Sequence, residues 1–160
     1  MPVTLRLYTD DTARLTDTDS FNSLASAVRH LCATRAPAGA IAELSLGESP
    51  DDGVVRAHLD GRRGWLAGGR SLREHAWRRD NPGKAALDDL IREIGETVGY
   101  TVRHPSGGPV HVYLRHDTLF HVVGRHMRED TACRRAVEQA RARIRQRRAT
   151  ADGPRLSLIS

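Results

Sequence analysis

Three side chains in the second half of the chain could do chemistry at one place, because they alternate along a predicted strand. His111, Tyr113 and Arg115 are two residues apart, and side chains two apart on a strand lie on the same face. Imidazole can transfer protons near neutral pH, a guanidinium group binds phosphate, and an aromatic ring can stack on a base. The trio therefore predicts a phosphate- and base-binding face or, alternatively, the site of a small metal-independent ribonuclease.

The strand that precedes this trio is expected to contribute to the same face. Residues 100–104 and 110–115 predict a hairpin around the Gly- and Pro-containing segment 105–109. With Val110, Val112 and Leu114 facing the core, Thr101 and Arg103 would lie across from the trio, depending on the register. The alternative interpretation is an ordinary polar outer face, which is typical of half-buried antiparallel sheets.

A second basic set occurs at helical spacing near the C-terminus. Arg134, Arg141, Arg145 and Arg148 are spaced i, i+7, i+11 and i+14, so one helix face carries all four. Together with Arg103 and Arg115, they predict a nucleic-acid-binding surface. A long stripe follows phosphates and offers few side chains that read bases, so we expect salt-sensitive binding without sequence preference. The alternative is a solvated helix face.

No spacing in the sequence predicts a metal site, a cofactor or a known catalytic motif. His116, His121 and His126 are five residues apart, and each such step rotates a helix by about 140°. The two cysteines form no C-x-x-C pair. The sequence also contains no P-loop, no nucleophile elbow and no dinucleotide fingerprint. We therefore expect no metal and no cofactor, and binding rather than catalysis.

The charge is distributed unevenly along the chain. The formal net charge is +5, yet residues 1–60 hold five Arg and nine acidic residues, whereas residues 61–160 hold twenty Lys or Arg and eleven acidic residues. This asymmetry predicts either a nucleic-acid partner or an acidic protein partner, the latter as for an inhibitor or immunity-type domain. Lys84 is the only lysine, so the excess of Arg also has a purely compositional explanation.

Length and composition indicate a globular chain. At 160 residues it fits one domain with a real core, and no apolar run approaches the roughly 20 residues of a membrane-spanning helix. The N-terminus lacks the pattern of a secretory signal, and two cysteines do not make a secreted disulfide framework. We therefore expect a cytoplasmic protein with no membrane association.

Hydrophobic periodicity predicts the elements that would position these residues. Strands are expected over residues 3–8, 41–46, 54–59 and 63–67, with a type I′ turn at Asp60-Gly61 and a polar turn region over 10–19. Helices are expected over residues 21–32, 71–77, 82–98, 119–127 and 130–148. Eight side chains are expected in the core: Val28, Leu31, Leu90, Ile94, Val112, Leu114, Val137 and Ile144.

This order of elements predicts the α+β class. We expect a single domain over residues 1–148, with a mixed or antiparallel sheet of short strands, helices packed on one face and a basic C-terminal helix. Residues 149–160 are expected to form a loose tail, in which Leu156, Leu158 and Ile159 could add an edge strand.

Overall fold

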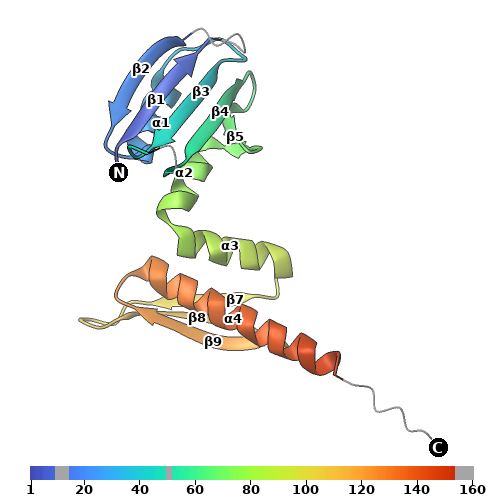
Figure 1. Ribbon diagram of the computed structural model, residues 1–160. Helices are drawn as coiled ribbons and strands as arrows, with labels where there is room; N and C mark the ends of the chain where they lie inside the picture. Colours follow the sequence, from blue (N-terminus) through green and yellow to red (C-terminus); the bar gives the residue numbers. More distant parts are fainter. Residues whose placement is uncertain (10–14, 50–51, 154–160) are drawn as a thin grey trace, which may run out of the picture. The chain divides into compact units, whose positions relative to one another are not determined.

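The computed structural model describes residues 1–9, 15–49 and 52–153. The chain forms two compact units, residues 1–80 and 81–160, and each unit has its own antiparallel sheet and its own hydrophobic core (Figure 1). The predicted α+β class, with antiparallel sheets and packed helices, is confirmed. The single domain over residues 1–148 stays a prediction, and the proposed edge strand at Leu156, Leu158 and Ile159 lies outside the described residues.

The first unit is a six-stranded sheet with two helices packed against it. The strands lie in the order β2-β1-β3-β4-β5-β6, and the elements are β1 (Val3–Tyr8), β2 (Leu15–Phe21), α1 (Leu24–Ala33), β3 (Ile41–Leu46), β4 (Val54–Asp60), β5 (Gly64–Ala67), β6 (Arg70–Ser71) and α2 (Leu72–Asp80). Both helices begin at a serine cap: the Oγ atoms of Ser23 and Ser71 accept the N–H groups of Ser26 and Glu74. Alternate residues of β1 are buried against this core.

Several features of the first unit differ from the sequence prediction. Helix α1 begins at Leu24 and not at residue 21, because Phe21 is the last residue of β2. Residues 15–21 form strand β2, not a turn, because an edge strand can be polar on both faces and then lacks apolar alternation. The β4–β5 connection is not a type I′ turn at Gly61, since Asp60 pairs with Gly64 and the left-handed residue is Gly64, with φ +75°. The Asp60 carboxylate accepts the N–H groups of Arg63 and Arg62, and these bonds hold the pKa of Asp60 below its usual value.

The second unit is a three-stranded antiparallel sheet with two helices on one face. Its elements are α3 (Pro82–Ile94), β7 (Gly99–Arg103), β8 (Val110–His116), β9 (Phe120–His126) and α4 (Glu129–Ala151). Helix α4 packs across β8 and β9, and α3 packs against α4 (Figure 1). Helix α4 lies close against the sheet at Gly124 of β9, where an added Cβ would overlap the Ala132 carbonyl oxygen and lie 2.5 Å from the Ala136 nitrogen.

The helix predicted over residues 119–127 was wrong. Residues 120–126 form strand β9, in which Phe120, Val122 and Gly124 are buried and alternate with less buried neighbours. A tight turn precedes it, and the His116 Nδ1 atom accepts the N–H groups of Thr118 and Leu119 there. A short apolar run satisfies helical and strand periodicity equally, so spacing alone could not decide.

The helix boundaries also shift. Helix α3 ends at Ile94, because Gly95 adopts φ +100°, so Gly99 is not the residue that ends this helix but the first of β7. Helix α4 continues to Ala151, beyond the start of the predicted tail. None of the helices in the described ranges is long and apolar enough to cross a bilayer.

Most of the predicted core is confirmed. Six of the eight side chains are buried: Val28, Leu31, Leu90, Val112, Leu114 and Val137. The other two, Ile94 and Ile144, are half-buried and pack at the margin of the second core.

Candidate nucleic-acid interface

The sheet face that points away from α3 and α4 gathers the residues predicted to do chemistry. Strand pairing forms three rows across this face: Gly99, Arg115 and His121; Thr101, Tyr113 and Val123; Arg103, His111 and Arg125. The expected juxtaposition of Thr101 and Arg103 with the His111–Tyr113–Arg115 trio is confirmed. Of the nine residues, three are Arg, two are His and none is acidic. We call these nine residues the open face.

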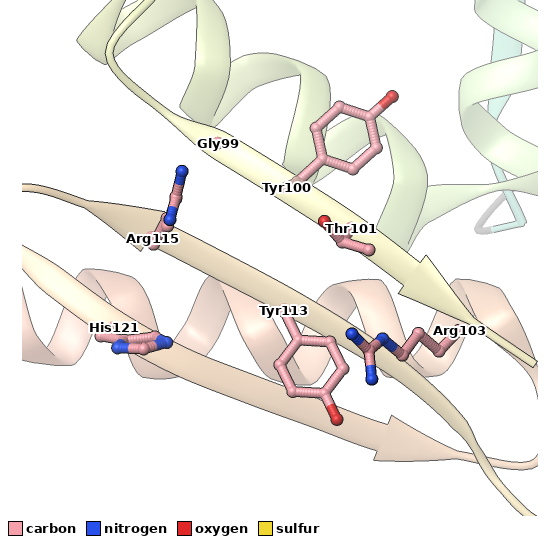
Figure 2. A pocket seen from close by; sticks show the side chains of 7 residues that line it. All are labelled: Gly99, Tyr100, Thr101, Arg103, Tyr113, Arg115 and His121. Atoms are coloured by element: carbon pink, nitrogen blue, oxygen red, sulfur yellow. The ribbon is translucent and has the colours of Figure 1, made fainter.

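A depression of about 420 Å³ lies on the open face. It is lined by Gly99, Tyr100, Thr101, Arg103, Tyr113, Arg115 and His121. Figure 2 shows Arg103 beside the Tyr113 ring at one end and Arg115 near Gly99 at the other. The depression thus places two guanidinium groups on either side of an aromatic ring, an arrangement suited to a chain of phosphates with bases between them.

Gly99 makes room for the side chain of Arg115. A Cβ at Gly99 would stand 3.2 Å from Nε and 3.4 Å from Cγ of Arg115, tighter than ordinary contact. The aliphatic part of Arg115 therefore crosses over β7, as expected where a strand glycine allows a close approach. The sequence did not predict this role, because Gly99 directly follows the helix expected over residues 82–98.

Two contacts fix the ring of Tyr113. The guanidinium carbon of Arg103 lies 5.5 Å from the ring centroid, within the range of a cation–π interaction. The Tyr113 hydroxyl group lies 3.2 Å from Nδ1 of His111, and the two share a hydrogen bond. Tyr113 is half-buried and Arg103 is exposed, so the guanidinium group keeps donors for an anion while it holds the ring.

The predicted stripe on α4 is only partly available to a ligand. Arg141 forms an ion pair of 2.9 Å with Glu93 of α3, and Arg134 one of 3.9 Å with Glu138. Arg145 and Arg148 are exposed and form no ion pair within the part of the chain that the structure describes. Because α4 covers the opposite side of the sheet, the stripe does not join Arg103 and Arg115. The structure therefore brings two of the six predicted arginines together and separates them from the other four.

The other flank of α4 contacts the edge of β9. Arg135 and Gln139 donate hydrogen bonds of 2.8 and 3.1 Å to the carbonyl groups of Arg125 and Val123. Further along this flank lies a second depression of about 370 Å³, formed by the β8–β9 turn and the C-terminal part of α4. His121 lines it as well as the first depression.

Two other histidines of the second unit, His116 and His126, accept backbone hydrogen bonds in turns. Nδ1 of His126 accepts the N–H group of Arg128 at 3.0 Å, as His116 does for its own turn. His126 is half-buried. Across the described ranges, no three His, Cys, Asp or Glu side chains are grouped as metal ligands. The expectation of no native metal stays a prediction.

Comparison of the chain with protein-family models, with curated proteins and with solved structures found no match. A fold alone would not define a function in any case, since one architecture can carry many unrelated sites. Charge and geometry on the open face must therefore support any functional inference.

Proposed function

We propose that this chain is a nucleic-acid-binding module that uses the open face and has no sequence preference. The observation that supports the proposal is the composition of that face: three Arg, two His, one Tyr and no carboxylate among nine residues. A polyanion meets no like charge there, and the forked donors of Arg match phosphate geometry. Phosphate contacts position a nucleic acid without reading its bases.

The distribution of acidic residues in the second unit favours this proposal over a merely solvated surface. All described acidic side chains of the unit lie on α3, on α4, in connecting segments or directly after α4. Several of them pair with cations away from the open face. Glu129, for example, lies 3.6 Å from Lys84 and 3.3 Å from His104. An ordinary polar face would carry both signs of charge, whereas this one carries only cations.

Salt-titrated binding with two matched variants tests the proposal. Arg103→Ala/Arg115→Ala removes two charges from the open face, and Arg145→Ala/Arg148→Ala removes two from α4. With a labelled single-stranded oligonucleotide, we expect the first variant to lower the slope of log K against log salt by about 1.4, or about 0.7 per lost phosphate contact. The α4 variant should change it little. Equal effects of the two variants, or no effect of the first, would refute the open face as the binding site.

A second candidate function is metal-independent RNA cleavage, favoured by the hydrogen bond between His111 and Tyr113 next to Arg103. Such a pair could relay a proton from a ribose hydroxyl group. Incubation of RNA with the protein in EDTA tests it: cleavage that disappears in His111→Ala would support it, and intact RNA would exclude it.

The remaining alternative is an acidic protein partner. It takes first place if the wild-type chain binds neither DNA nor RNA at low salt but binds an acidic polypeptide. We also propose a cytoplasmic location, supported by two free thiols, Cys32 and Cys133.

A further inference from the structure

We infer that the bound nucleic acid is single-stranded, and that its path continues from the open face around the β8–β9 turn to Arg143 and Arg147 on α4. The inference rests on the proposed function. Its starting point is His121, which lines both depressions of the second unit. The two hollows therefore meet at this side chain, with cations on either side of it.

The geometry of α4 against β9 explains why these two arginines are available. The helix runs antiparallel to the strand, and four helix residues advance about 6 Å while two strand residues advance about 6.7 Å. Arg135 therefore lies beside Arg125 and donates a hydrogen bond to its carbonyl group, and Gln139, four residues later, does the same for Val123. Continuing the series brings Arg143 level with His121.

Neither the Arg143 nor the Arg147 side chain makes a hydrogen bond or ion pair to any residue that the structure describes, and both side chains are exposed. Both line the second depression, together with the neutral polar residues Gln146 and Thr150. Asp117 contributes the one carboxylate in the lining. The neighbouring His116 also lines the depression, and its Nδ1 atom accepts the N–H group of Thr118 in the turn. Two unpaired guanidinium groups about 6 Å apart along the helix suit successive phosphates of one strand.

A single strand fits this path and a duplex does not. The path changes direction at the β8–β9 turn, and duplex DNA is stiff over about 150 base pairs. In addition, stacking on the Tyr113 ring requires an unstacked base, which a single strand provides.

Oligonucleotides of two lengths test the inference. Single-strand-binding OB folds, for comparison, cover about 4–16 nucleotides each. We expect an oligouridylate of about 4 nucleotides to occupy the open face alone and one of about 12 to reach α4. We expect Arg143→Ala/Arg147→Ala to lower the salt slope for the long oligonucleotide by about 1.4 and to leave the short one unchanged. Arg145→Ala/Arg148→Ala, with the same loss of charge on the same helix, is the matched control.

Each result decides one part of the inference. If the long oligonucleotide is insensitive to Arg143 and Arg147, or equally sensitive to the control pair, the extended path is refuted. If a duplex of the same length binds as tightly as the single strand, the single-strand assignment is refuted. In both cases, sensitivity of the short oligonucleotide to Arg103→Ala/Arg115→Ala would leave the proposed function standing. Far-UV circular dichroism of every variant controls for folding.

Discussion

Gly124 is a position where one added methyl group should damage the packing of the second unit. In Gly124→Ala the new Cβ would overlap the Ala132 carbonyl oxygen and would lie 2.5 Å from the nitrogen and 2.9 Å from the Cβ of Ala136. The first two obstacles are helix backbone, which cannot rotate away as a side chain can. Helix α4 must therefore move away from β9, and contacts of the buried Ala132, Cys133 and Ala136 weaken with it.

The expected cost follows from this overlap. Ordinary carbon contacts begin near 3.4 Å, so the helix must retreat by on the order of 1 Å, and overpacking of this kind costs about 1–3 kcal/mol or more. Domains are stable by only about 5–15 kcal/mol. The variant should therefore unfold at a clearly lower urea concentration than the wild type.

Two probes in the chain separate the response of the two units. Cys133 is buried in the second unit, and burial, together with the carboxylates of Glu129 and Asp130, raises the pKa of its thiol. Its labelling therefore reports opening of that unit. Both tryptophans, Trp65 and Trp77, lie in the first unit, so their fluorescence reports the other one. In Gly124→Ala we expect labelling of Cys133 at a lower urea concentration.

The matched control is Gly108→Ala, where the nearest atom to an added Cβ is 3.7 Å away, an ordinary contact. An unchanged midpoint for Cys133 labelling in Gly124→Ala would contradict the close packing of α4 on β9. A tryptophan transition that shifts together with Cys133 labelling would support the single domain predicted from the sequence.

Three further outcomes are expected. Leu90→Ala should lower the free energy of unfolding by about 2–5 kcal/mol, because Leu90 is fully buried, whereas Ile94→Ala should lower it less, because Ile94 is half-buried. Denaturant titration compares the two variants, and equal losses would contradict the assigned core. Tyr113→Ala should weaken single-strand binding by about 1–3 kcal/mol through lost stacking, whereas Tyr113→Phe keeps the ring and should bind nearly as the wild type; equal losses would argue against stacking. Asp60 has a lowered pKa, so its stabilising effect is present above the ordinary value of 3.8 and is lost as pH falls below it. In Asp60→Asn, the free energy of unfolding, followed by tryptophan fluorescence, should therefore fall less steeply at acid pH, and an unchanged fall would contradict the hydrogen bonds of the Asp60 turn.

The strands of the open face differ in how well the sequence predicts them. The regular alternation of β8 places Val112 and Leu114 in the core and Tyr113 and Arg115 outside, and the structure agrees. The β9 contribution could not be predicted, because its apolar residues also match helical spacing. His121 and Arg125 were therefore absent from the expected face, although the pairing of β9 with β8 places both there.

Packing between elements explains most of the other differences. Arg134 and Arg141 form a stripe in sequence, but Glu138 and Glu93 pair with them in the fold, and Glu93 belongs to a different helix. The position of Arg143 and Arg147 beside the β8–β9 turn depends on the packing of α4 against β9. Residue spacing within one helix can predict the Arg134–Glu138 pair, but neither the Arg141–Glu93 pair nor the position of Arg143 and Arg147.

The most direct test of the central claim is to map the bound strand onto the protein by nuclear magnetic resonance. Backbone amide shifts would be followed while a single-stranded oligouridylate is added at low salt. We predict the largest changes at Thr101, Arg103, Tyr113 and Arg115, and small changes at Arg145 and Arg148. Changes confined to the face of α4 that carries Arg145 and Arg148, with unchanged amide shifts in β7 and β8, would contradict a nucleic-acid interface on the open face.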